Sequence, residues 1–283
     1  MAQTISHTPQ IIYILGAGNS GSTLLSMALG AHSRVLSVGE LSALDRYLRS
    51  DLSCTCGVPL SRCEFWGHVD LGSAYVPLRP LISERSTHMS KRILQHDALF
   101  HLTVQRNLDI YHEGSERSGC PVVVDSSKDN IRLYYLALSG RFRLLPIRLV
   151  RNGLAYIDSK RRRGRGFITS FRRWSRMNTN AVTTLRRLRL MDSALTVSYD
   201  EFASSPGEVL AKICERVGLA FEPQMVDLSG QLFHNIAGTP GRFDAGIISP
   251  RDEWRARTGP ITRARFGLCG GYRANAHFNK KRP

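Results

Sequence analysis

Hydrophobic and polar positions divide the chain into two kinds of segment. Short runs rich in Ile, Val and Leu are typical of buried strands, and longer segments with apolar residues three and four positions apart are typical of helices. The two kinds alternate, which predicts a parallel sheet covered by helices on both faces. The expected strands are 11–15, 35–38, 122–124, 144–150 and 195–198; the expected helices are 23–31, 41–49, 83–111, one ending near 138, one after 151, 167–190 and 206–217.

The length of the chain, 283 residues, allows one domain with a substantial core. We predict a single α/β domain with a P-loop-like parallel β-sheet flanked by helices. Residues 51–80 contain three cysteines and read as an insertion, whereas residues 228–283 are rich in Gly and Pro and read as an ordered loop with a short helix at 252–257. Pro146 within the fourth expected strand suggests a bulge or an edge there.

Composition narrows the class of protein. The formal net charge of +16 predicts attraction to anions such as nucleotides, acidic glycans, nucleic acid or an anionic membrane surface. The chain lacks the aromatic pattern, zinc-finger spacing and helix-turn-helix that would favour nucleic acid as the main partner. No apolar run reaches the length of a membrane span, and no leader-like segment precedes the first strand. We therefore expect a cytoplasmic protein without a transmembrane segment.

The segment GAGNSGST, residues 16–23, joins the first expected strand to its helix. Glycines at positions 16 and 21 followed by two hydroxyl residues have the spacing of a phosphate-binding loop, whose amides close around an anion at a helix N-terminus. Ser22 stands where a nucleotide triphosphatase has its lysine, so the charge that reaches a β- or γ-phosphate is missing. The loop is thus predicted to bind one 5′-phosphate group, not a triphosphate.

Three further strands are expected to end in residues with useful chemistry. Glu40 follows the second strand, residues 125–128 (DSSK) follow the third, and Arg151 follows the fourth, with Ser159 eight residues further on. Carboxyl ends of parallel strands meet at one edge of a sheet, where ligands bind. We expect these loops to converge there, and an Arg–Ser pair suits a second phosphate through charge-assisted hydrogen bonds.

Two patterns taken together, G-x-S-G-S-T-L-L at 18–25 and V-R-N-G-x5-S at 150–159, resemble the sulfotransferases that use 3′-phosphoadenosine 5′-phosphosulfate (PAPS). The resemblance spans about residues 11–255 and includes VVDSSKDNIR, SYDEF and HNIAGTPGRF, and CTCGVPLSRCEFW looks like a segment common in prokaryotic members. It implies one sulfotransferase domain in which the insertion at 51–80 shapes the acceptor pocket.

The resemblance implies a role for each matching residue. The first loop would hold the 5′-phosphosulfate, Arg151 and Ser159 the 3′-phosphate, and the C-terminal loop would close over the donor. The implied donor-binding residues are Gly18, Asn19, Ser20, Gly21, Ser22, Thr23, Arg151, Ser159, Tyr199, Gly238, Thr239 and Arg242. Two depart from the family pattern, since Thr239 replaces an asparagine and Asn19 replaces an arginine or lysine that lies near the leaving group.

The implied reaction moves a sulfuryl group from PAPS to a hydroxyl or amine acceptor, leaves 3′-phosphoadenosine 5′-phosphate (PAP) as product, and needs no metal. Glu40 corresponds to the glutamate base of the tyrosylprotein branch, although a helix-capping carboxylate is the alternative for this position. Lys128 matches a family lysine and would stabilise developing negative charge. We expect a small-molecule, lipid or glycan acceptor, and the basic charge suits an acidic one.

Two other functions stay open at this point. A P-loop kinase-like phosphotransferase would need a magnesium-holding aspartate, and Asp125 does end a strand. A catalytically inactive PAP- or PAPS-binding protein would explain the missing cation at Asn19.

The three clustered cysteines, Cys54, Cys56 and Cys63, also leave alternatives open. They could hold zinc if a fourth ligand such as the nearby His68 joined them, or two of them could form a disulfide. A reduced, structured loop without a metal is the interpretation we prefer, because their spacing is not a standard structural-zinc pattern.

Overall fold

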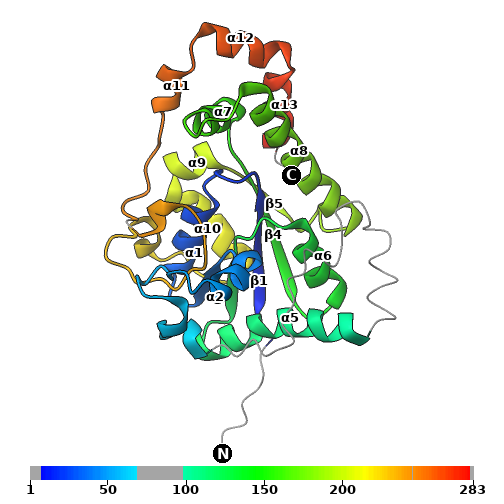
Figure 1. Cartoon of the computed structure of the whole chain (residues 1–283), viewed down its shortest axis with the longest axis vertical. Coiled ribbons are helices and arrows are strands. Elements are labelled where there is room, and N and C mark those ends of the chain that lie inside the picture. The colour runs from blue at the N-terminus through cyan, green and yellow to red at the C-terminus, as the bar shows by residue number, and fades with distance from the viewer. Residues whose placement is uncertain (1–7, 69–97, 244, 281–283) are drawn as a thin grey trace, which may run out of the picture.

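The computed structural model describes residues 8–68, 98–243 and 245–280. Its centre is one parallel sheet with the strand order β2-β3-β1-β4-β5 (Figure 1). The strands are β1 (Gln10–Gly16), β2 (Val35–Gly39), β3 (Val122–Asp125), β4 (Arg143–Val150) and β5 (Leu195–Ser198). Helices cover both sides of this sheet in Figure 1, so the predicted α/β architecture is confirmed.

Alternation along β1 explains the two covered faces. Ile12 and Ile14 belong to one apolar cluster, Ile11 and Tyr13 belong to another, and all four side chains are fully buried. The first cluster is completed by α1 (Ser22–Gly30), α9 (Tyr199–Ser204) and α10 (Pro206–Arg216). The second is completed by α5 (Ala98–Ser118), α6 (Asn130–Ser139) and α8 (Phe167–Arg187). Burial on both sides is why this strand reads as an unbroken apolar run.

A third apolar cluster covers the carboxyl ends of β1 and β4. Trp174 of α8 is fully buried there and packs on the rings of Phe266 and Phe278. The cluster joins α7 (Gly153–Arg161) to α11 (Glu253–Arg257), α12 (Pro260–Leu268) and α13 (Gly271–Asn279). The sequence predicted α11, but the expectation of only a loop and one short helix at 228–283 was incomplete. Few apolar residues mark α12 and α13, and three glycines interrupt their pattern.

Short elements fill the remaining loops. They are η1 (Leu41–Ala43), α2 (Leu44–Arg49), η2 (Leu60–Arg62), η3 (Trp66–His68), η4 (Pro223–Val226) and η5 (Pro240–Phe243). The helix expected at 83–111 continues to Ser118, and its expected start lies outside the described residues, as does the insertion beyond residue 68.

Pro146 lies in β4 without a bulge. The strand pairs with β1 in continuous register, with Pro146 opposite Tyr13. The pairing of β4 with β5 begins only at Ile147, so no described strand flanks the proline on that side. Its position is thus locally an edge, where a missing backbone donor costs nothing.

None of the helices in the described part of the chain combines the length and hydropathy that a bilayer crossing requires.

Candidate functional site

The loop between β1 and α1 forms a tight turn whose polar side chains face inwards. Asn19 and Gly21 adopt left-handed backbone conformations, with φ of 71° and 90°. The amide of Ser20 donates to the carbonyl of Ala17 at 3.1 Å. Ser20, Ser22 and Thr23 are all buried. Because the first amides of an α-helix have no partner within the helix, the start of α1 offers donors to an anion.

Arg151 reaches this loop from the end of β4. Its Nη1 donates to the carbonyl of Asn19 at 2.8 Å, and its guanidinium carbon lies 4.8 Å from the centre of the Tyr199 ring. That ring lies directly against Gly21, since a Cβ added there would come within 2.3 Å of it. Gly21 is therefore required by both its backbone conformation and its neighbour. The structure thus brings together the loop at 16–23 and the segments that contain Arg151 and Tyr199, which the sequence linked only through motifs of the same family.

Positive charge is concentrated around Arg151. Burial lowers the pKa of the guanidinium, the neighbouring Tyr199 and Asp200 raise it, and Arg162 and Arg251 lower it further. Arg162 and Arg251 were not among the donor-binding residues that the sequence predicted. Each stands in a segment with many other charged residues, and no local pattern distinguishes it. Three arginines therefore create a positive field where an anion would be bound.

Three buried polar atoms at this point have no hydrogen-bond partner among the described residues. They are Nδ2 of Asn19, Oγ of Ser20 and Nε of Arg151. Buried polar groups are nearly always hydrogen-bonded, because leaving one unpaired costs free energy. All three can donate, so the loop and Arg151 fit an anionic phosphate ligand.

Glu40 and Lys128 form an ion pair at the ends of β2 and β3. Lys128 Nζ lies 2.7 Å from Glu40 Oε1 and donates to the carbonyl of Ser126, also at 2.7 Å. The amide of Ser126 donates to the carbonyl of Gly39 at 2.8 Å, which ties the two strand ends together. The side chain of Glu40 keeps 24 % of its surface exposed and that of Lys128 keeps 10 %. The predicted convergence of strand-end loops is thus observed here as well.

The C-terminal loop lies across both groups. Ile236 bridges to the end of β2, donating to the carbonyl of Val38 at 3.1 Å and accepting from the amide of Glu40 at 2.7 Å. Gly238 lies directly against Thr23, and the amide of Thr239 donates to Thr23 Oγ1 at 3.2 Å. The loop therefore connects the Glu40 end of the site to the start of α1. Arg242 follows in η5.

Backbone strain marks the same region. Asn19, Lys128 and Ala237 are three of the five described non-glycine residues with positive φ. Such conformations cost free energy and concentrate at functional sites.

Asp125, the candidate magnesium ligand of a kinase, is fully engaged by the protein. Its Oδ1 accepts from the amide of Ser127 at 2.7 Å, and its Oδ2 accepts from the hydroxyl of Tyr111 and lies 3.3 Å from Nε of Arg132. Burial raises the pKa of this carboxyl, and Arg132 and the hydrogen bonds from Ser127 and Tyr111 offset part of that increase. We call Asp125, Tyr111, Arg132 and Ser127 the Asp125 cluster. It fixes the start of the segment that carries Lys128, through the hydrogen bond from the amide of Ser127.

Ser159 is buried on α7, and the contacts of the described residues do not join it to Arg151. Its neighbour Asp158 is paired with Arg257 of α11 at 3.0 Å. The predicted role of Ser159 at the 3′-phosphate stays a prediction.

The three clustered cysteines gather with a residue that their spacing did not indicate. Cys54, Cys56 and Cys63 are free thiols, and His234 joins them from the C-terminal loop. His68, the ligand that the sequence suggested, is exposed and lies outside this group. The signal for His234 was absent from the local sequence because it stands 171 positions beyond Cys63.

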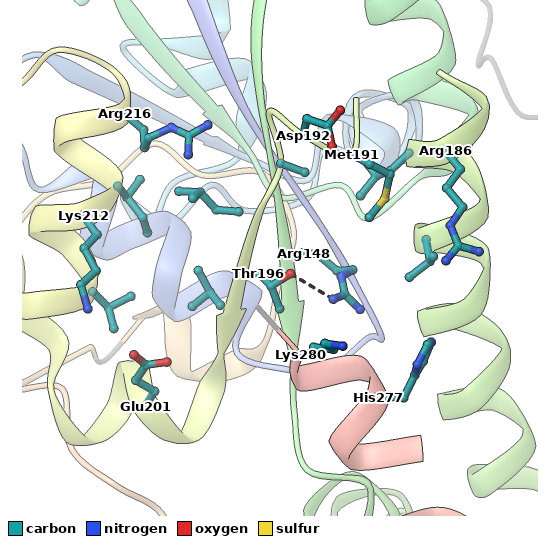
Figure 2. A pocket seen from close by; sticks show the side chains of 17 residues that line it. Arg148, Arg186, Met191, Asp192, Thr196, Glu201, Lys212, Arg216, His277 and Lys280 are labelled. Atoms are coloured by element: carbon teal, nitrogen blue, oxygen red, sulfur yellow. Dashed lines mark hydrogen bonds between the residues drawn. The ribbon is translucent and has the colours of Figure 1, made fainter. Parts of the chain in front are cut away.

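A cavity of about 890 Å³ lies elsewhere, between β5, α8, α10 and α13. Figure 2 shows Arg148 donating to Thr196 across its floor, with Lys212, Arg216 and Arg186 around it. Its lining includes none of the predicted site residues. The cavity is therefore separate from the loop and from the Glu40–Lys128 pair.

Comparison with known proteins identifies the fold. No protein-family model matches the chain, and no curated protein matches it. Among solved structures, the sulfotransferase domain of the Synechococcus PCC 7002 olefin synthase is 22 % identical, with a TM-score of 0.62 over 100 % of this chain and 99 % of that one. The sulfotransferase domain from the curacin biosynthetic pathway is 19 % identical, with a TM-score of 0.53 over 93 % and 98 % of the two chains. The resemblance to sulfotransferases is therefore confirmed at the level of the fold, which this chain shares with those domains over 93 % of its length or more.

Proposed function

We propose that the protein is a sulfotransferase that moves a sulfuryl group from PAPS to a hydroxyl or amine acceptor. The observation that carries the proposal is the contact between Arg151 and the loop after β1, where three buried polar atoms lack a protein partner. We infer one ligand with two phosphate groups and a nucleoside between them, which would engage both the loop and the arginine that the fold brings to it from 132 positions away in the sequence. The sulfotransferase fold supports the same donor.

The donor would be held by the residues that the motifs named. The start of α1 and the hydroxyls of Ser20, Ser22 and Thr23 would hold the 5′ end, and Arg151, supported by Arg162 and Arg251, would hold the 3′-phosphate. PAPS supplies the activated sulfuryl group when it is bound. Asn19 carries no charge, but its carbonyl fixes the guanidinium of Arg151, so the loop is not without a cation.

Glu40 is the proposed general base for the acceptor. Its carboxylate is held by Lys128 and stays partly exposed, so an acceptor proton can reach it. General bases contribute about 10²–10⁴-fold in rate. Lys128 fixes the orientation of this carboxylate and adds positive charge where negative charge develops in transfer. The acceptor class is a small molecule, a lipid or a glycan with a reactive hydroxyl or amine.

Binding of PAP, the reaction product, tests the donor site without any knowledge of the acceptor. At a PAP concentration a hundredfold above Kd, ligand linkage predicts a gain of about 2.7 kcal/mol in unfolding free energy. The Arg151→Ala variant should lose most of this gain. Arg143→Ala is the matched control, because Arg143 is exposed at the opposite end of the same strand and its loss should leave PAP binding unchanged.

The wild-type protein gives an independent readout if Arg151→Ala folds poorly. Adenosine 5′-monophosphate lacks the 3′-phosphate and should stabilise the wild type less than PAP does. Equal stabilisation by the two nucleotides, or stabilisation by ATP with magnesium and none by PAP, would contradict the proposal.

A further inference from the structure

Four metal-ligating side chains meet between the insertion and the C-terminal loop, away from the residues used above. The sulfurs of Cys54, Cys56 and Cys63 and a ring nitrogen of His234 all lie within 4.8 Å of one another. Cys56 Sγ is 3.7 Å from Cys63 Sγ, which is 3.2 Å from His234 Nδ1. A tetrahedral zinc ion with Zn–S bonds of about 2.3 Å places its sulfurs about 3.8 Å apart. The donor atoms are thus already close to the separations of such a site.

The backbone of the insertion aims the thiols at one point. The amide of Gly57 donates to the carbonyl of Cys54 at 3.0 Å, and the amide of Cys54 donates to the carbonyl of Val58 at 2.9 Å. Gly57 has a φ of 90°, which a tight turn after two closely spaced ligands requires. The amide of Trp66 donates to Cys63 Sγ at 3.4 Å, a contact that favours a thiolate.

The imidazole of His234 is positioned by the residue between the first two cysteines. Thr55 Oγ1 donates to the carbonyl of Phe233 at 2.7 Å and accepts from the amide of Asn235 at 2.6 Å. The ring of Phe65 stacks on the imidazole, with centres 5.7 Å apart. Residues on both sides of His234 are therefore fixed to the cysteine turn, as ligands of a built metal site are fixed by their neighbours.

We propose that Cys54, Cys56, Cys63 and His234 bind one zinc ion in a closed structural site. Three thiolates and an imidazole suit zinc, whereas magnesium and calcium prefer oxygen ligands. Binding displaces the thiol protons to solvent and involves no change of oxidation state. Four protein ligands leave no open position, so the ion holds the fold and takes no part in the transfer chemistry. Cys56 and His234 are partly exposed, which gives the ion a path in.

The position of the site explains what such an ion would do. His234 is two residues from Ile236, which bridges to the end of β2, and five from Thr239, which contacts Thr23. The ion would therefore fasten the C-terminal loop to the insertion, on the side of the sheet where Glu40 lies. This inference does not depend on the identity of the donor or the acceptor.

Metal analysis of the purified, reduced protein tests the proposal directly. We expect inductively coupled plasma mass spectrometry to find about one zinc per chain in the wild type and to find that zinc lost in Cys56→Ser. Cys269→Ser is the matched control, since Cys269 is exposed after α12 and lies outside the cluster. That variant should keep the full zinc content.

A second measurement tests the proposal even if the Cys56 variant does not fold. The wild type, stripped of metal and kept reduced, should bind one Co²⁺ and develop the thiolate-to-cobalt charge-transfer and visible bands of a tetrahedral sulfur-rich site. His234→Ala should weaken the binding of Co²⁺ while keeping the charge-transfer band. Absence of zinc in the wild type together with no uptake of Co²⁺ would overturn the proposal. A disulfide between two of the three cysteines, found by alkylation and peptide mass analysis, would overturn it as well.

Discussion

The loop after β1 and the carboxylate of Asp125 lie at the ends of neighbouring strands, and their buried polar atoms differ in how they are paired. In the cluster, both oxygens of Asp125 are engaged by Ser127, Tyr111 and Arg132. In the loop, Asn19 Nδ2 and Ser20 Oγ have no partner among the described residues, and the same is true of Nε of the adjoining Arg151. The three unpaired atoms are themselves buried, as Asp125 is, so exposure of these atoms to solvent does not explain the difference.

This difference distinguishes polar groups that stabilise the fold from polar groups that are available to a ligand. A buried carboxylate whose two oxygens are both engaged within the protein has no free acceptor to offer, and removing it takes the counter-charge from a buried cation. Donors that the fold leaves unpaired are costly unless an external group completes them. The pairing of Asp125 is that of a structural group, whereas the unpaired donors of the loop and Arg151 fit the donor site proposed above. The Glu40–Lys128 pair lies between these cases, since it is paired yet partly exposed.

Loss of the Glu40 carboxylate should have the greatest consequence for activity. If this paired but accessible carboxylate takes the acceptor proton, Glu40→Gln should lower turnover about 10²–10⁴-fold and leave the affinity for PAP unchanged. Turnover would be followed as PAP release across a panel of hydroxyl and amine acceptors. Glu116→Gln, on the exposed face of α5, is the control and should keep full activity. Undiminished turnover in Glu40→Gln would make the carboxylate a structural partner of Lys128 only.

Next in size is the loss of stability when the Asp125 cluster is broken. Asp125→Ala leaves the charge of Arg132 buried without its partner, and removal of one member of a buried pair costs about 3–5 kcal/mol. Urea unfolding measures the change, with Asp125→Asn as the milder variant that keeps the shape of the side chain.

Asp45→Ala is the control for that experiment, because Asp45 pairs with Arg49 on the surface and its loss should cost under about 0.5 kcal/mol. A stable Asp125 variant that loses stabilisation by ATP and magnesium would contradict the structural role of Asp125, since the carboxylate would then be a metal ligand.

The sheet and the binding loop could be predicted because local pattern determines them. Every expected strand lies within one residue of its observed bounds at each end. Buried strands are recognisable in the sequence as apolar runs, and parallel pairing places their carboxyl ends at one edge of the sheet. For that reason the gathering of the loops that carry Arg151, Lys128 and Glu40 at one edge of the sheet could be predicted, although their individual contacts could not.

What the sequence did not reveal depends on contacts between distant segments. His234 joins the cysteines only because the C-terminal loop bridges to β2 at Ile236, and no spacing rule encodes that path. Arg162 and Arg251 stand among many other arginines, so their place beside Arg151 had no local signal. The missing cation at Asn19 was visible in the sequence, but the hydrogen bond from Arg151 to the Asn19 carbonyl had no local signal.

The smallest expected effect on stability is at Ser20, which we compare with Ser26, a second buried serine six positions further on. Ser20 Oγ has no partner in the described chain, so Ser20→Ala should change unfolding free energy by under about 0.5 kcal/mol. A hydrogen bond to a charged group contributes about 1.5–3 kcal/mol, so the same variant should bind PAP about 10- to 100-fold more weakly.

Ser26 bonds to Ser37 at 2.8 Å within the core, and Ser26→Ala should show the reverse pattern. It leaves the hydroxyl of Ser37 unpaired, which costs about 1–3 kcal/mol in stability, and it touches nothing that would hold a phosphate, so PAP affinity should not change. Calorimetric titration with PAP and urea unfolding of both variants separate the two effects. If both serines lost stability and neither lost affinity, the loop would be scaffold like the Asp125 cluster, and the unpaired donors would have no binding role.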